Sequence, residues 1–302
     1  MISIIICSRH PDISASLREN IKETIGVEYE IIAVDNSNND YSIFSAYNKG
    51  FSQSQFPCLC FLHEDVLFRT KDWGINLVNH LADKKVGIIG VAGGKMMTKI
   101  PASWAVGGRC IHIIQHQNNK KSAPTAVKDP LDFTGNRLPV VLLDGVFLSM
   151  RKDLFDVVKF DETFAGFHGY DFDISAQAVI AGYNNYVVYD VLLEHFSEGY
   201  RDAAYYVNLT NIHKKWEKKL PLFSYDEPDQ IRSDIDLTEA KILAKFIRRL
   251  ARAGFTSAEI INYASYYVNL LNTPEAKNQM RFIRLKILFE RVFNSKKIRF
   301  SF

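Results

Sequence analysis

Cysteine is scarce in this chain, and the cysteines that are present do not form a recognisable site. Cys7, Cys58, Cys60 and Cys110 include no CxxC pair, so neither a zinc knuckle nor a disulfide framework is indicated. Reduced thiols in a cytosolic setting fit this usage best.

Long apolar runs are absent as well. No stretch of the sequence reaches the roughly 20 apolar residues that a membrane-spanning helix needs. The first residues lack a basic segment and reach Arg9, His10 and Asp12 too early for a signal peptide. We therefore expect a soluble, cytoplasmic protein, or at most one held peripherally at the inner face of a membrane.

Glycine is missing from the positions where nucleotide-binding loops need it. Residues 8–12 contain none, which argues against the first turn of a dinucleotide fold and against a nicotinamide cofactor. Gly94-Lys95 resembles the end of a phosphate-binding loop. However, Ile89 stands where such a loop needs its first glycine, and Met96 stands where it needs Ser or Thr.

A helical metal site at His112 and His116 is disfavoured for a different reason. Their spacing would bring two imidazoles together on a helix, but the isoleucines at 111, 113 and 114 predict extended backbone.

The residues that are present can build a substantial core in a chain of uneven charge. Hydrophobic residues make up 47% of the 302 positions, enough for one large domain or for an ordinary domain with an appendage. The net charge is +3, yet residues 229–302 carry 14 Lys and Arg against 7 Asp and Glu, whereas residues 1–228 carry 23 against 27. This asymmetry suggests two parts with different partners.

Strands and helices are predicted to alternate through the first part of the chain. We expect strands at 3–7, 29–34, 86–91 and 138–143, another ending just before residue 63, and extended structure at 186–189. Helices are expected from a cap at residue 12 or 14 to Gly26, and over 41–53, 73–82 and 171–181. This order predicts a parallel sheet in which Asp12, Asp35 and Asp65 gather along one edge. Residues 115–138 read as a loop that could serve as a lid or an acceptor-binding segment.

Beyond residue 228 the pattern becomes helical. Apolar residues recur at helical spacing from 237 to 250, Thr256 and Glu259 form a possible capping box, and Thr273-Pro274 opens a third helix. Residues 277–302 mix basic and apolar positions as an amphipathic helix does. Such a helix could lie on an anionic membrane or pack on the catalytic domain or a second subunit.

The most informative stretch is 61–65, where an apolar run ends in His63, Glu64 and Asp65. A buried strand that ends in acids delivers metal ligands to the edge of an α/β sheet, where such enzymes keep their chemistry.

Several segments, in order, resemble the inverting GT-A glycosyltransferases of family 2, in the branch with a His-acid-Asp variant of the DXD motif. The segments are Ser3-Ile4-Ile5-Ile6, Val34-Asp35-Asn36-Ser37, Asn48-Lys49-Gly50, residues 61–65, Asp144-Gly145, Phe160-Asp161-Glu162, Tyr170-Asp171-Phe172-Asp173 and Glu194-His195. The resemblance implies a Rossmann-like, mostly parallel sheet flanked by helices over residues 1–228, with a helical basic extension over 229–302.

The resemblance also implies how a nucleotide-sugar donor is bound. Asp35, with Asn36, would meet the nucleotide base, and Asp65 would bind a divalent Mn or Mg ion on the diphosphate. A hard cation held by carboxylate oxygen stabilises the negative charge of the departing diphosphate. His63 stands where the motif has its first Asp, and Glu64 is the middle residue. Whether His63 touches the ribose, the metal or neither is open.

The catalytic residue implied by the resemblance is Asp171, which would take the proton from the acceptor hydroxyl. Family members usually carry Glu before this Asp, whereas this chain has Tyr170, so a paired-carboxylate effect on its pKa is not expected. Asp171 could instead be only the cap of the following helix.

Two further residues are implied on the donor side. His195 matches a histidine that many GT-A enzymes use as a second metal or diphosphate contact, although it could be a structural histidine. Asp144 matches a carboxylate that accepts hydrogen bonds from the donor sugar, although Asp-Gly is also an ordinary turn.

The sequence therefore predicts a metal-dependent enzyme that moves a sugar, most simply from a UDP-sugar, to a glycan or lipid-linked acceptor, in the synthesis of bacterial surface polysaccharide. No nucleic-acid partner is expected, and oligomers are possible. One alternative is a non-catalytic nucleotide-sugar-binding or assembly protein that keeps the fold. Another is a metal-dependent nucleotidyl or phosphoryl transferase, which would need the phosphate loop that the sequence lacks.

Overall fold

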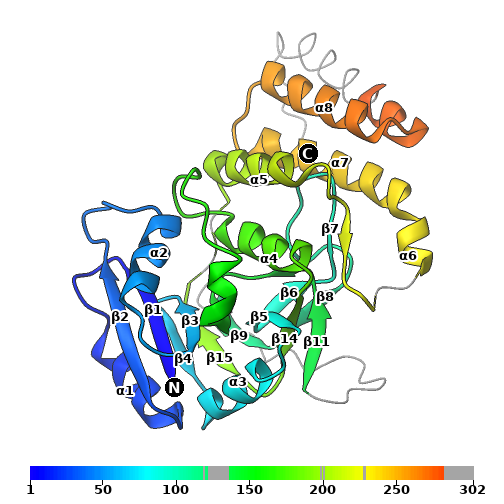
Figure 1. Ribbon diagram of the computed structural model, residues 1–302. Coiled ribbons are helices and arrows are strands. Elements are labelled where there is room, and N and C mark those ends of the chain that lie inside the picture. The colour runs from blue at the N-terminus through cyan, green and yellow to red at the C-terminus, as the bar shows by residue number, and fades with distance from the viewer. Residues whose placement is uncertain (118–119, 122–135, 198, 200, 227–228, 282–302) are drawn as a thin grey trace. The chain divides into compact units, whose positions relative to one another are not determined.

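The protein is described by a computed structural model at residues 1–117, 120–121, 136–197, 199, 201–226 and 229–281 (Figure 1). The chain divides into two compact units. The first comprises residues 1–97, 103–200 and 221–226, and the second comprises 98–102, 201–220 and 227–302. Packing thus groups the segment 201–220 with the C-terminal helices, whereas the domain boundary expected after residue 228 stays a prediction.

A seven-stranded sheet forms the centre of the first unit, in the order β11-β14-β5-β13-β3-β1-β2. Its strands are β1 (Ile2–Ser8), β2 (Tyr29–Asp35), β3 (Cys58–Leu62), β5 (Val86–Gly90), β11 (Arg137–Val140), β13 (Phe147–Arg151) and β14 (Asn184–Val188). β1 runs parallel to both β2 and β3, and β14 runs parallel to β5. β13 lies antiparallel between β3 and β5. The predicted α/β architecture with a mostly parallel sheet flanked by helices is confirmed.

Helices cover both faces of this sheet, and the alternation of side chains along the strands explains how. In β3, Cys58, Cys60 and Leu62 pack into one apolar cluster, while Leu59 and Phe61 pack into the other. The first cluster includes side chains of α1 (Ala15–Thr24) and α3 (Trp73–Leu81), and the second includes side chains of α2 (Ile43–Gln53) and α4 (Tyr170–Ile180). A short 3-10 helix, η1 (Lys152–Asp156), follows β13.

Smaller sheets join segments that lie far apart in the sequence. One has the order β10-β9-β15-β4, formed by Lys120–Lys121, Ile113–Gln117, Leu193–His195 and Val66–Phe68. A second joins β12 (Leu142–Leu143), β6 (Ala92–Gly94) and β8 (Arg109–Ile111), and a third pairs β16 (Leu222–Phe223) with β7 (Met96–Met97).

The strand expected at 138–143 is in fact divided. β11 pairs with β14 of the central sheet, whereas β12 pairs with β6 of a different sheet. A run of apolar residues cannot show such a change of partner, because apolar side chains suit either strand. Most of the loop expected at 115–138 lies outside the described residues.

The second unit is helical. Its helices include α5 (Ala203–Trp216), α6 (Asp229–Ser233), α7 (Ile235–Arg252) and α8 (Ser257–Leu271). The capping box at Thr256 and Glu259 is present at the start of α8, and residues 274–281 are helical. The remainder of the amphipathic segment predicted at 277–302 lies outside the described residues. Within the part of the chain that the structure describes, no helix combines the length and apolarity needed to cross a membrane.

Candidate active site

The end of β3 meets β15 at the candidate site, although 130 residues separate them in the sequence. After Leu62 the chain turns through His63, Glu64 and Asp65 into β4, which pairs antiparallel with β15 so that Val66 faces His195. The backbone N–H of Phe196 donates to the carbonyl oxygen of Asp65 at 3.0 Å. This pairing brings His195 beside the predicted metal ligand Asp65.

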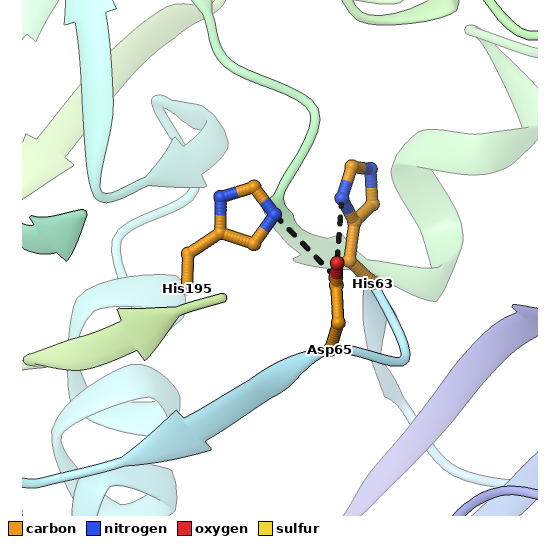
Figure 2. Close-up of side chains that lie close together, drawn as sticks. All are labelled: His63, Asp65 and His195. Carbon is orange, nitrogen blue, oxygen red and sulfur yellow. Dashed lines mark ion pairs between the residues drawn. The ribbon is translucent and has the colours of Figure 1, made fainter. Parts of the chain in front are cut away.

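Three side chains converge at this point (Figure 2). Nδ1 of His63 lies 3.9 Å from Oδ1 of Asp65, and Nε2 of His195 lies 3.4 Å from the same oxygen. One donor atom from each residue can be chosen so that all lie within 4.8 Å of one another. Two imidazole nitrogens and a carboxylate oxygen are a common ligand set for a divalent metal.

The hydrogen bonds around His195 favour metal binding through Nε2. Nδ1 of His195 lies 3.0 Å from Oε1 of Gln115, and the Gln115 amide nitrogen donates to the backbone carbonyls of His116 and Ser197. The amide orientation is therefore set, and Oε1 accepts the Nδ1 proton. Such an outer partner leaves Nε2 with its lone pair toward Asp65. The residues present thus fit a divalent cation.

The charges at this site also favour a cation. Burial raises the pKa of the Asp65 carboxyl, but the neighbouring imidazoles of His195 and His63 and the hydroxyl of Ser197 outweigh it and hold the pKa well below its usual range. Partial burial, together with His195, lowers the pKa of His63. The site therefore presents a carboxylate beside an imidazole that favours its neutral form, as metal binding requires.

Glu64 does not point its charge into this group. Its carboxylate accepts hydrogen bonds from the hydroxyl of Ser8 at 2.8 Å, and from the backbone N–H and Nε of Arg9 at 3.1 and 2.6 Å. These bonds tie the end of β3 to the turn after β1. Glu64 therefore positions the strand ends, and its predicted donor contact stays a prediction.

Asp171 lies in the first turn of α4, and Gly169 occupies the N-cap position. The reading of Asp171 as the helix cap is therefore wrong. Burial, followed by the negative charge of Asp144, raises the pKa of Asp171 to about 7. The paired-carboxylate effect that Tyr170 made unexpected is present after all, because Asp144 supplies the second carboxylate from another element.

Asp144 is held in place by hydrogen bonds to both of its oxygens. Nε1 of Trp104 donates to Oδ2 at 2.8 Å, and the backbone N–H of Val146 donates to Oδ1 at 3.1 Å. The next residue, Gly145, donates its N–H to Oδ2 of Asp171 at 3.2 Å. The Asp-Gly turn thus also supports the predicted base. Trp104 helps to position Asp144, a role that the sequence did not reveal.

The predicted nucleotide-binding residues lie at the end of β2. Asp35 pairs with Ser8 across the sheet and is exposed. Hydrogen bonds from the backbone and side chain of Ser37 lower its pKa. Asn36 is buried, and its side chain exchanges two hydrogen bonds with the backbone of Tyr41. Asn36 thus shapes the turn that presents Asp35, and a direct nucleotide contact for either residue stays a prediction.

A second buried carboxylate supports the metal side of the site. Glu194 precedes His195 and accepts hydrogen bonds from Nε and Nη2 of Arg69, while Nε2 of His116 lies 2.6 Å from its other oxygen. His116 is in β9, which confirms the extended backbone expected there. No local pattern marks Arg69 or Gln115, since both act across strands that only the fold brings together.

Comparison with known proteins gives the enzyme class. Residues 3–216 match the model of a family described as "Glycosyltransferase like family". The chain belongs to this family. No curated protein matches the chain.

Among solved structures, the chain is similar to GalNAc-T7 in a crystal structure with UDP, GalNAc and Mn2+. The TM-score is 0.52 at 13% sequence identity, and the match covers 95% of this chain and 57% of that one. At such low identity the likeness shows the fold. The fold is that of a GT-A glycosyltransferase, and the predicted enzyme class, glycosyltransferase, is confirmed.

Proposed function

We propose that this glycosyltransferase moves a sugar from a nucleotide-diphosphate-sugar, most simply a UDP-sugar, to an acceptor hydroxyl with inversion. The observation that carries the proposal is that Gly145 links the predicted base to the metal-binding group. Its N–H donates to Asp171, and its carbonyl oxygen accepts from the hydroxyl of Tyr170, which lies 2.8 Å from Nε2 of His63. The backbone of one residue, Gly145, thus connects the predicted proton acceptor to the predicted cation site.

In the proposed reaction Asp171 takes the proton of the acceptor hydroxyl. The hydroxyl oxygen attacks the anomeric carbon, a carbon–oxygen bond forms, and the bond to the diphosphate oxygen breaks on the opposite side. The nucleoside diphosphate leaves with the electron pair, and the proton remains on Asp171. Asp65, His195 and His63 would hold a divalent cation, which stabilises the charge on the leaving diphosphate.

The ligand atoms at the cation site bear on which metal would be bound. Mg2+ favours oxygen ligands and retains water, whereas the first-row transition metals, of which Mn2+ is the weakest binder, take nitrogen ligands as well. Of the two expected ions, a site with two imidazoles and one carboxylate favours Mn2+. The GalNAc-T7 structure contains Mn2+ and UDP, which supports the same choice of cation and donor for this chain.

The test is a panel of nucleotide-sugars with Mn2+, in which released nucleotide and thermal shift are measured together. Asp171→Asn is expected to reduce transfer by roughly 10² to 10⁴-fold while donor binding persists, whereas Asp65→Ala is expected to weaken metal-dependent binding itself. Asp156→Asn is the matched control, because this aspartate is exposed in η1 and has no place in the proposed chemistry. Normal transfer by Asp171→Asn would contradict the proposed base.

The alternative is a non-catalytic nucleotide-sugar-binding protein with the same fold. It predicts a thermal shift with donor and Mn2+ but no nucleotide release with any candidate acceptor. The raised pKa of Asp171 favours the enzyme, because a carboxyl that titrates near pH 7 is suited to proton transfer. The same panel decides between the two.

For the acceptor we propose a glycan or a lipid-linked glycan of a bacterial surface polysaccharide, made at the cytoplasmic face. This setting rests on the resemblance described above. A peripheral membrane contact through the basic C-terminal segment is tested by liposome co-sedimentation with and without residues 277–302. Equal binding of anionic vesicles by both forms would remove that contact.

A further inference from the structure

We infer that Tyr170 is a positioning residue that holds His63 in a single tautomer, with the unprotonated Nδ1 directed to the metal. This inference rests on the proposed function, because it concerns the same cation site. It answers the question that the sequence left open about His63, and it gives a role to the tyrosine that stands where the family usually has Glu.

The hydrogen-bond geometry at the Tyr170 hydroxyl sets the direction of each bond. A phenol has one proton to donate and can also accept. The hydroxyl lies 3.0 Å from the carbonyl oxygen of Gly145, which can only accept, so the proton of Tyr170 goes there. The contact of 2.8 Å with Nε2 of His63 must then be donated by the imidazole. His63 is therefore protonated at Nε2, and Nδ1 carries the lone pair.

The unprotonated nitrogen of His63, Nδ1, is the one that faces the other possible metal ligands. Nδ1 of His63 is the atom 3.9 Å from Oδ1 of Asp65, and Figure 2 shows it directed at that carboxylate. Tyr170 does for His63 what Gln115 does for His195, since each accepts a proton from the nitrogen that points away from the site. Opposite tautomers of the two histidines would thus present one lone pair each to a cation bound beside Asp65.

Tyr170 is well fixed for this task. Its side chain is buried against three aromatic rings, with centroid distances of 5.6 Å to Tyr47, 6.1 Å to Phe160 and 6.3 Å to Phe44. The Tyr47 hydroxyl also interacts with that of Tyr170.

The close approach of Gly145 supports the same assignment. A Cβ added at Gly145 would lie 2.1 Å from the Tyr170 hydroxyl oxygen. Only glycine therefore allows the backbone to come near enough to accept the proton of Tyr170. The two departures from the family motif, His63 for Asp and Tyr170 for Glu, are thus in contact with each other. Tyr170 is hydrogen-bonded to both His63 and Gly145.

The inference is tested by Mn2+ binding in the absence of nucleotide and substrate. Tyr170→Phe removes the hydroxyl and keeps the ring, and we expect Mn2+ affinity to fall by about 10 to 100-fold, the usual effect of losing an outer partner of a ligand histidine. Affinity is measured by calorimetry and by the electron paramagnetic resonance signal of free Mn2+. Tyr183→Phe is the matched control, because Tyr183 lies just beyond the opposite end of α4.

Two further measurements separate positioning from a general loss of structure. In His63→Ala the additional change Tyr170→Phe should have no further effect on Mn2+ affinity, since Tyr170 acts through His63. Long-range proton–nitrogen correlation spectra of the metal-free wild type should show His63 protonated at Nε2, and Tyr170→Phe should reduce that preference.

The possible outcomes distinguish this inference from the proposed function. Unchanged Mn2+ affinity in Tyr170→Phe, or His63 protonated at Nδ1 in the wild type, would overturn the role of Tyr170. Absence of any Mn2+ binding by the wild type would overturn the cation site and the inference with it. Mn2+ binding that depends on Tyr170, without sugar transfer to any acceptor, would leave the inference standing and contradict the proposed enzyme reaction.

Discussion

At the scale of single residues, the site depends on carboxyl groups of one chemical type in different surroundings. Asp65 lies beside two imidazoles and has a lowered pKa, while Asp171 is buried near the negative charge of Asp144 and has a raised one. The first suits a cation ligand and the second a proton acceptor. Their environments, more than their identity, separate the proposed roles.

This difference predicts a pH dependence for the proposed transfer. Asp171 must be deprotonated to act as a base, and its pKa is raised to about 7. We expect kcat/KM to rise with pH up to about 7, to fall roughly tenfold for each pH unit below that value, and to level off above it. The measurement is the initial rate of nucleotide release over this range.

The control for that profile is Mn2+ affinity determined at each pH, so that loss of metal is not mistaken for protonation of the base. A rate that stays constant through pH 7 with saturating Mn2+ would contradict the assignment of Asp171.

At the scale of elements, α2 lies unusually close to the central sheet. A Cβ added at Gly50 would lie 2.3 Å from Cγ2 of Ile5 in β1 and 3.3 Å from Cγ2 of Val34 in β2. The sequence shows Gly50 only as part of the Asn48-Lys49-Gly50 segment. The structure explains the glycine, because α2 packs directly on β1 and β2 at this residue.

Gly50→Ala is accordingly expected to destabilise the protein in spite of the better helix propensity of alanine. Overpacking of this kind costs about 1–3 kcal/mol of the free energy of unfolding. Gln53→Ala places alanine at an exposed position of the same helix and serves as the control. Urea unfolding measures both, and equal stability of the two variants would show that β1 and β2 accommodate the methyl group.

In the helical unit, Glu239 of α7 holds the segment 98–102 through its buried carboxylate. The carboxylate accepts the backbone N–H groups of Lys99 and Ile100 at 2.6 and 3.0 Å. Burial raises its pKa from 4.5 to about 7 despite these bonds. The folded state therefore binds the proton more tightly than the unfolded state does.

The sign of the resulting pH effect follows from this order of pKa values. The contribution of Glu239 to stability is fully present below about pH 4.5 and is lost as the pH rises through about 7. The difference in free energy of unfolding between wild type and Glu239→Gln should change in that window, by on the order of 1–3 kcal/mol. Glu275→Gln, at an exposed position, is the control. A difference independent of pH would contradict the raised pKa.

At the scale of the whole first unit, the proposed cation would join the turn after β3 to the end of β15. The ligands at 63, 65 and 195 are brought together only in the folded chain, so the ion should bind the folded state far more strongly than the unfolded one. At a concentration about 100 times its dissociation constant, Mn2+ would add about 2.7 kcal/mol of stability.

We therefore expect Mn2+ to raise the melting temperature by roughly 5–10 °C, since each 1 kcal/mol shifts the midpoint by about 2–4 °C in a domain of this size, and we expect chelation to reverse the rise. Asp65→Ala should melt at the same temperature with and without Mn2+, whereas Asp156→Asn should respond as the wild type does. Differential scanning calorimetry provides the measurement. An equal rise in Asp65→Ala would place the Mn2+ elsewhere.

Local sequence patterns are enough to predict the α/β class, most strand and helix positions of the first 200 residues, and the acidic strand end at His63, Glu64 and Asp65. These features are local, since they depend on hydrophobic periodicity, caps and the residues that follow a strand. Three features emerge only in the folded chain: β13 runs antiparallel, Asp144 rather than residue 170 places a carboxylate near Asp171, and Tyr170 touches His63. Each of these is a contact between residues more than 20 positions apart, and no local pattern encodes which distant side chains a fold will bring together.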